Sequence, residues 1–479
     1  MSIRSLPLSK YQKSFTSDAA SAAIEANDLE AAVELLDRGR EIMWSNMEGY
    51  RRPLDQLRDV NMQLADQFES VSLQLEKDLA LSSESGPMNC ESPTPLPRSQ
   101  RCRILSEEWE KLLGQIREID GFNNFLQAVP FTTLRTAAAE GPVIIVNVSK
   151  HRSDAIILHI DKPPILVALP DAQPEHLTHL GEELPPAPHP LGHRVDYSDL
   201  VYPILRDLWA TIVSPVRDCL TELAVPRRSR IWWCSTSELC ALPLHAAGPY
   251  WPRQSNFPDT YTSSYIPTLS ALITARSNLV ISQPTAPKLL IVGQLVRGQE
   301  GIRKEIEEVQ QLGDFVDAIV DTDASRDAVL RGLQQHSWAH IACSGHPGDN
   351  SQPLHASFEL HGGSRLTLLD LLEARLPNAD SAFLTTCYSV AGNLTTLDET
   401  IPIATALQFC GLRSVVGTLW IIDDEGGPTI SKEFYKYMFR NGNKVDFRDS
   451  AEALNVATRE MRKNSVSPDR WITFIHIGA

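Results

Sequence analysis

Two residues suited to covalent chemistry follow strand-like stretches in the second half of the sequence. The stretch from Trp338 to Asp349 begins with apolar residues and then carries His346 in a polar, glycine-containing turn. The stretch from Ser381 to Ser389 also begins with apolar residues and reaches Cys387. A cysteine attacks as its thiolate, and an imidazole can exchange protons with it. The pair therefore suggests covalent catalysis by Cys387 with His346 as its acid–base partner.

Such a pair needs a scaffold that brings both turns to one edge, and the surrounding sequence predicts one. From Tyr197 onward, short apolar stretches alternate with helix-length stretches, and strands are expected at 230–235, 288–293, 339–343, 382–387, 414–420 and 471–478. This alternation predicts an α/β fold with a mainly parallel sheet flanked by helices. Functional residues of such sheets lie beyond the carboxyl ends of the strands. His346 and Cys387 both occupy that position in the sequence.

The preceding part of the sequence divides into three segments. Residues 1–81 have apolar and small residues at helical spacing, interrupted near Asp28, which predicts a helical hairpin of the tetratricopeptide-repeat type. Residues 82–100 are rich in Ser and Pro and predict a flexible linker or loop. Residues 101–196 predict the N-terminal α/β part of the domain that continues over 197–479. One hairpin cannot bury both of its faces, so either the chain belongs to a longer repeat protein or the hairpin packs on the next domain.

Composition excludes several classes of function. The formal net charge of -16 disfavours binding to nucleic acid or to an anionic membrane. The 8 cysteines are scattered, without the close spacing of zinc modules or disulfide frameworks. Neither a signal-peptide core nor an apolar run of about 20 residues is evident, so a cytoplasmic protein is expected. No metal and no organic cofactor are expected.

Several motifs in the right order resemble the CHAT domain, a caspase-like protease domain often found with tetratricopeptide repeats. They are WAHIAC (338–343) with the following Gly and His, SAFLTTC (381–387), GLRSVVGTLWIIDDE (411–425), WITFIHIGA (471–479), LPLHAAG (242–248) and SYIPTLSAL (264–272). The last two, and the helical start with LLDRGREIMWS (35–45), are similar to fungal members. The resemblance implies a caspase-like fold and a cysteine endopeptidase that uses a Cys/His dyad, with Cys387 as its nucleophile.

The sequence departs from the family pattern at the histidine. Family members commonly read H-x-A-C-H-G, and an ungapped alignment places Ser344 at the catalytic position. A shift of two residues places His346 there instead, in an S-G-H turn like that of the related metacaspases. We favour His346 as the catalytic residue. His340 and Cys343 belong to the strand itself, so both are expected to pack in the sheet.

Two hypotheses of different class follow. In the first, Cys387 attacks the scissile carbonyl of a protein substrate and His346 protonates the leaving amine. Backbone N–H groups near Gly345 and Cys387 would stabilise the oxyanion. A regulatory protein that binds the helical region would activate this endopeptidase. In the second, Ser344 replaces the catalytic histidine, and the domain is a catalytically inactive scaffold or interaction module. The distance between a ring nitrogen of His346 and the Cys387 sulfur distinguishes the two hypotheses, because only the first requires the two groups to be close.

Overall fold

The computed structural model describes residues 9–48, 51–80, 98–120, 122, 125, 129–184, 197–277, 288–295, 300–346, 356–374, 376, 379–385, 403–420, 422, 425–442 and 444–479. The chain forms two compact units. The smaller unit comprises Met1–Gln12 and Arg38–Pro130, and the larger comprises Lys13–Asp37 and Phe131–Ala479. The four segments inferred from the sequence stay a prediction, because the proposed linker falls largely outside the described residues.

The smaller unit is built on two helices, α3 (Arg51–Ala80) and α4 (Arg98–Arg117). Phe68 lies at the centre of their apolar contact, with its ring 5.5 Å from that of Trp109 and 5.6 Å from that of Phe125. A kink at Asn61 divides α3, and the Asn61 side chain accepts a hydrogen bond from the backbone N–H of Leu64. Asn61 thus caps the second half of the helix. The helical start expected from the sequence is confirmed.

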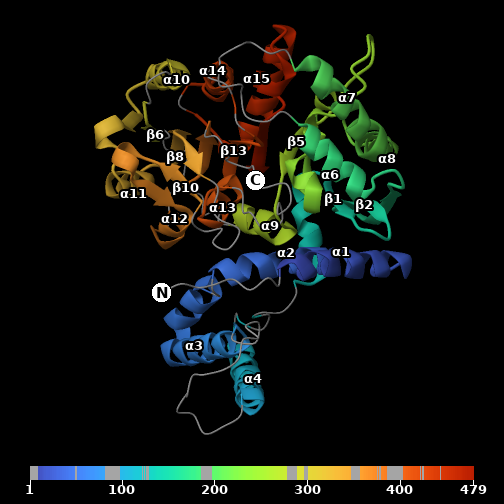
Figure 1. Ribbon diagram of the computed structural model, residues 1–479, viewed down its shortest axis with the longest axis vertical. Helices are drawn as coiled ribbons and strands as arrows, with labels where there is room; N and C mark the ends of the chain where they lie inside the picture. The colour runs from blue at the N-terminus through green and yellow to red at the C-terminus, as the bar shows by residue number, and fades with distance from the viewer. Residues whose placement is uncertain are drawn as a thin grey trace, which may run out of the picture. The chain divides into compact units, whose positions relative to one another are not determined.

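The larger unit is organised around its strands (Figure 1). The strands are β1 (Val143–Val148), β2 (Ser153–His159), β3 (Lys162–Ala168), β4 (Arg230–Ser235), β5 (Thr262–Tyr265), β6 (Leu289–Gly293), β7 (Val316–Val320), β8 (Trp338–Ala342), β9 (Gly345–His346), β10 (Ser357–Glu359), β11 (Arg365–Thr367), β12 (Ser381–Leu384), β13 (Ser414–Thr418) and β14 (Phe474–Gly478). Within the described residues, the long sheet has the order β3-β2-β1-β4-β5-β14-β13-β12-β8-β6-β7. A small separate sheet has the order β11-β10-β9.

The long sheet consists of two parallel sets of opposite direction. Strands β1, β4, β5 and β14 run one way. Strands β13, β12, β8, β6 and β7 run the other way, and the sets meet antiparallel at β13 and β14. At one end of the sheet, β2 pairs antiparallel with β1, and β3 pairs antiparallel with β2. The predicted α/β fold with a mainly parallel sheet is confirmed. The carboxyl ends of β8, β12 and β13 consequently lie together at one edge.

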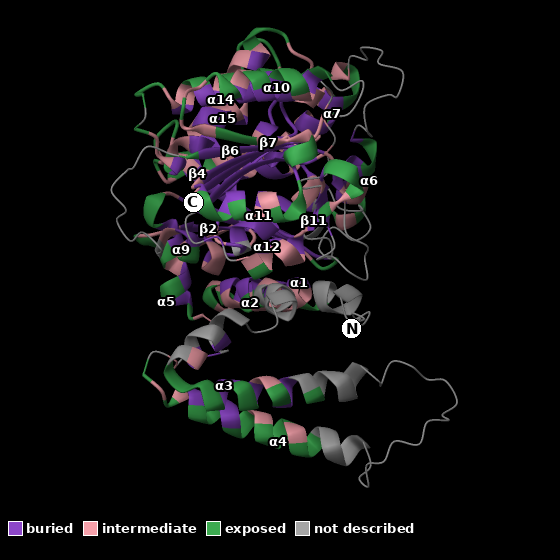
Figure 2. Ribbon diagram, turned by 90° about the vertical axis from the view of Figure 1, so that its left-hand side faces the viewer, coloured by how far each residue is buried: buried purple, intermediate pink, exposed green. Residues whose placement is uncertain are grey.

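Helices cover both faces of this sheet. They are α5 (Phe131–Leu134), α6 (Pro174–Glu183), α7 (Ser198–Leu208), α8 (Ser214–Glu222), α9 (Leu269–Ser277), α10 (Glu300–Gln310), α11 (Arg326–Gln335), α12 (Leu368–Ala374), α13 (Ile403–Phe409), α14 (Gly426–Met438) and α15 (Ser450–Lys463). Figure 2 shows α10, α14 and α15 on one side of the buried strands and α9, α11 and α12 on the other. No helix in the described ranges combines the length and apolar character that a membrane crossing requires.

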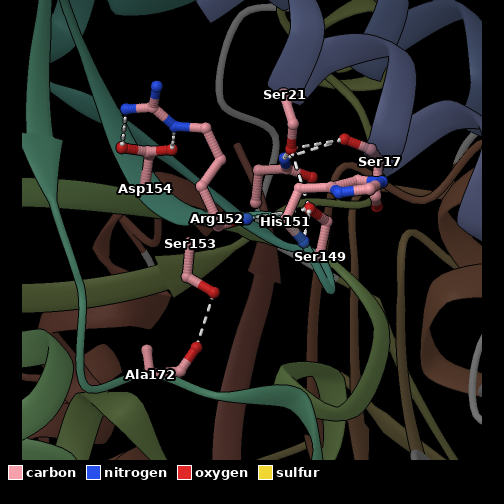
Figure 3. Close-up of polar contacts among 9 residues, drawn as sticks. Ser17, Ser21, Ser149, His151, Arg152, Ser153, Asp154 and Ala172 are labelled. Carbon is pink, nitrogen blue, oxygen red and sulfur yellow. Dashed lines mark hydrogen bonds and ion pairs between the residues drawn. The ribbon is translucent and has the colours of Figure 1, made fainter. Parts of the chain in front are cut away.

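The first helical hairpin packs partly on the sheet. It is formed by α1 (Ser9–Glu25) and α2 (Leu29–Glu48). Asp28 caps α2, since its side chain accepts a hydrogen bond from the N–H of Ala31 at 3.0 Å. Residues 13–37 of this hairpin belong to the larger unit. The Ser21 hydroxyl lies 2.9 Å from that of Ser149, beside the end of β1 (Figure 3). This part of the hairpin therefore packs on the next domain, which is one of the two arrangements expected from the sequence.

A buried carboxylate forms a second attachment of the hairpin. Asp37 of α2 is only 5% exposed, and it accepts hydrogen bonds from the Leu269 N–H at 2.6 Å and the Ser270 hydroxyl at 2.5 Å. Both donors belong to the first turn of α9, where backbone N–H groups have no partner within the helix. Asp37 thus supplies a long-range cap for α9, and the negative charge suits the positive end of the helix dipole.

Candidate active site

The candidate site begins at the ends of two adjacent strands, β8 and β12. All five residues of β8 and all four of β12 are buried. They pair in parallel, with Leu384 opposite Ile341, and the Thr385 N–H donates to the Ile341 carbonyl at 3.1 Å. Such apolar stretches form central strands because both of their faces are covered by helices. The fold thus brings the stretch that leads to His346 beside the stretch that leads to Cys387.

His346 lies in β9, directly after the turn that ends β8. Its cross-strand partner in β10 is Ser357, while Gly345 is opposite Phe358. The Nε2 atom of His346 lies 2.7 Å from Oε2 of Glu359. Both side chains are partly exposed, His346 by 37% and Glu359 by 36%. The imidazole is therefore ordered by a carboxylate while it stays accessible to solvent.

Ser344, the alternative at the catalytic position, occupies the turn between β8 and β9. Its backbone carbonyl accepts a hydrogen bond from the Glu359 N–H at 2.8 Å. That bond continues the β9–β10 pairing by one more residue. Ser344 is half-buried. The turn, the histidine and Glu359 are thus joined through both backbone and side-chain bonds.

Cys387 and its neighbours in 386–402 lie outside the described residues. The structure describes β12 up to Thr385, two residues before Cys387 in the sequence. The assignments of Cys387 and His346 as the catalytic pair therefore stay predictions. No disulfide joins the described cysteines, Cys219, Cys234, Cys240, Cys343 and Cys410.

His340 is a buried part of the sheet, as expected from its place within the strand. Its side chain is fully buried, and its ring stacks on Phe383 at a centroid distance of 5.5 Å. Its Nδ1 atom lies 3.1 Å from the Tyr435 hydroxyl, and its Nε2 atom lies 3.2 Å from Oε1 of Glu305. Burial, followed by the nearby Glu305 charge, raises the pKa of Tyr435 well above its usual range. Cys343 is likewise buried, at 2% exposure.

Glu305 is itself 1% exposed, and it has close neighbours on two sides. One neighbour is His340, and the other is the first turn of α14. A Cβ atom built on Gly427, in that turn, would lie 2.7 Å from the Glu305 carboxylate oxygen Oε2. The positive end of a helix dipole favours a carboxylate at this place. This cluster joins α10, β8 and α14 beneath the edge where the candidate site lies.

Glu359 is the site residue that sequence reasoning missed. It lies 13 positions after His346, and no motif connects the two. The available signal is the alternation in SFE, 357–359, which places Ser357 and Glu359 on one face of a strand and Phe358 on the other. Only the pairing register shows that this face also carries His346. Among the described residues, no group of three or more His, Cys, Asp or Glu side chains is arranged to hold a metal ion.

These features define the larger unit as an α/β protein whose candidate site lies at the carboxyl ends of parallel strands. Residues 202–479, more than half of the chain, match the family of the CHAT domain, and the chain belongs to that family. A search of curated proteins finds no match.

Solved structures give distant likenesses. Separase in the Saccharomyces cerevisiae separase–securin complex is 12% identical, with a TM-score of 0.45, and the match covers 95% of this chain and 38% of the separase chain. The Arg-specific cysteine proteinase gingipain R (RGPB) is 8% identical, with a TM-score of 0.39, over 56% of this chain and 68% of its own. A complex of the pro- and mature domains of Porphyromonas gingivalis RgpB gives the same identity and TM-score, over 56% and 69%.

Proposed function

We propose that this protein is a cysteine endopeptidase in which Cys387 is the nucleophile and His346 the acid–base partner. The observation that carries the proposal is the pairing of β8 with β12 in a CHAT-family chain. The first strand leads to a partly exposed, carboxylate-bound His346, and Cys387 is the third residue after the end of the second strand. A trans peptide advances the Cα position by about 3.8 Å, so three residues span less than about 12 Å. A thiol and an imidazole at such neighbouring strand ends suit amide hydrolysis.

The chemistry assigned to these groups balances in two steps. The Cys387 sulfur bonds to the scissile carbonyl carbon while its proton passes to His346. The C–N bond of the peptide then breaks, and His346 gives the proton to the leaving amine. Water then attacks the thioester carbonyl carbon and gives a proton to His346. The C–S bond breaks, the carboxylic acid product leaves, and His346 returns the proton to the sulfur. The catalytic oxyanion site near Gly345 and Cys387 belongs to the same proposal.

Labelling by a cysteine-directed peptide warhead tests this assignment. We expect the wild-type chain to be labelled at Cys387, identified by mass spectrometry, and Cys387→Ala to be unlabelled. Cys240→Ala is the matched control, because Cys240 is half-buried, forms no disulfide and lies outside the candidate site. It should be labelled as the wild type is. Equal labelling of Cys387→Ala and wild type contradicts the proposal.

A second pair of variants decides between the two candidate histidine positions. His346→Ala should slow labelling by roughly 10²–10⁴-fold, the usual contribution of an acid–base partner. Ser344→Ala should label at nearly the wild-type rate. The second candidate function, an inactive interaction module, is favoured by Ser344 at the position where the family pattern has histidine. A folded wild-type chain that is never labelled at Cys387 supports the module instead.

The setting of this activity is part of the proposal. We infer a cytoplasmic protein, because no disulfide joins the described cysteines, and a protein substrate rather than nucleic acid, which the net charge of -16 disfavours. We also propose a regulatory protein partner that binds the N-terminal helical region. Supporting this, residues 13–37 of the hairpin belong to the same compact unit as the sheet. A partner bound to them would therefore contact the unit that carries the candidate site.

A further inference from the structure

The His346–Glu359 contact is made by two short strands of the small sheet. His346 in β9 is opposite Ser357 in β10, and Glu359 is two residues further along β10. Two residues along a strand is one full side-chain period, so Glu359 is the diagonal neighbour of His346 on the same face. The Nε2–Oε2 distance of 2.7 Å is that of a charge-assisted hydrogen bond. A carboxylate can only accept, which assigns the proton to Nε2.

The backbone holds Glu359 in register with the turn before the histidine. Its N–H donates to the Ser344 carbonyl at 2.8 Å. On its other side, Glu359 is opposite Arg365 in β11. Strands on both sides thus hold the backbone of Glu359, and β10 also holds the backbone of His346. With both backbones held, the Nε2–Oε2 hydrogen bond restricts the positions that the His346 ring can take.

We propose that Glu359 is a positioning residue for His346, an inference that rests on the proposed endopeptidase function. With its proton on Nε2 and donated to Glu359, the neutral ring keeps a lone pair on Nδ1, the atom that would accept the proton of the Cys387 thiol. When Nδ1 takes the thiol proton, the Glu359 carboxylate faces the new imidazolium and stabilises it. The proton then passes from Nδ1 to the leaving amine, and Nε2–H stays bonded to Glu359 throughout.

The energetics favour this role over a purely structural one. Ion pairs between partly exposed side chains contribute little to the free energy of unfolding, since water screens them and side-chain entropy opposes them. Each member of this pair is more than one third exposed. The contact therefore adds little to fold stability, while orientation of an acid–base group has a large effect on rate.

The test uses the full-length chain and a peptidyl acyloxymethyl ketone, with the first-order labelling constant kinact and the dissociation constant Ki measured separately. Glu359→Gln keeps the shape of the side chain and removes its charge. We expect kinact to fall by roughly 10–100-fold, the range found for carboxylates that orient metal-bound histidines, with Ki within about twofold of the wild type. Glu359→Asp keeps the charge on a side chain one methylene shorter, so its kinact should lie between those of Glu359→Gln and wild type.

Glu373→Gln is the matched control. It makes the same carboxylate-to-amide change at an exposed position of α12, and its kinact should equal that of the wild type. Thermal unfolding of all variants should occur at the wild-type temperature. An unchanged or increased kinact in Glu359→Gln overturns the positioning role, and an increase would show that Glu359 restrains His346. Wild-type chain unlabelled at Cys387 overturns the endopeptidase proposal itself, and with it the role of Glu359.

Discussion

Replacing Asp37 by Ala tests how the helical hairpin is attached to the sheet unit. The substitution leaves the Leu269 N–H without its acceptor, and Leu269 is only 1% exposed. A hydrogen bond to a charged group contributes about 1.5–3 kcal/mol. The half-buried Ser270 hydroxyl can rotate to another acceptor, so its loss adds only about 0.5–1 kcal/mol. We therefore expect Asp37→Ala to lower the free energy of unfolding by about 2–4 kcal/mol.

Asp28→Ala provides the matched comparison. Asp28 is an aspartate of the hairpin that likewise caps a helix, its own α2, by accepting from the Ala31 N–H at 3.0 Å. Unlike Asp37, it is exposed. Water can replace its hydrogen bond, so the loss should be about 1 kcal/mol, as is typical of N-caps. Urea unfolding followed by tryptophan fluorescence measures both variants, and amide hydrogen exchange at Leu269 locates the effect. If Asp37→Ala costs no more than Asp28→Ala, the argument for a buried long-range cap is wrong.

Two further predictions concern buried groups. Burial and then the Arg230 charge lower the pKa of His476 well below its usual 6.5, so the unfolded chain alone binds this proton. The unfolding free energy should thus fall below pH 6.5, with His476 contributing up to about 1.4 kcal/mol per pH unit. His476→Gln should lose that slope in urea titrations at pH 5.5 and 7.5, and an unchanged slope would refute the assignment. Gly427→Ala places a Cβ 2.7 Å from the Glu305 carboxylate and should destabilise by about 1–3 kcal/mol. Gly114→Ala, which meets no atom within 4 Å, should stabilise its helix by about 0.5–1 kcal/mol; thermal unfolding compares them, and similar melting shifts would contradict the packing argument.

The central strands could be predicted because their sequences carry the signal locally. β4 spans Arg230–Ser235, the range expected from its apolar residues, and β8 and β12 likewise follow apolar stretches. A strand covered by helices on both faces has to be apolar along its whole length. Such an apolar run can be recognised in the sequence without knowing which strands pair with it.

Strands at other places were missed because their residues do not show that pattern. β7, Val316–Val320, is at the end of the sheet and has two exposed residues, and β3 at the other end is exposed at both of its termini. β5, Thr262–Tyr265, is mostly polar yet largely buried, since hydrogen bonds such as that of Ser264 with His476 satisfy its side chains. Pairing with neighbours, rather than local composition, makes these segments strands.

The sequence by itself determined the α/β alternation, the CHAT resemblance and the choice of His346 and Cys387, because each depends on residue types at short spacing. The tertiary structure decided which distant groups meet. Glu359 reaches His346 through the register of two paired strands, and Asp37 reaches the first turn of α9 although 232 positions separate it from Leu269. Such contacts depend on where the folded backbone places each carboxylate. The sequence alone does not show which donor a given Asp or Glu will bind.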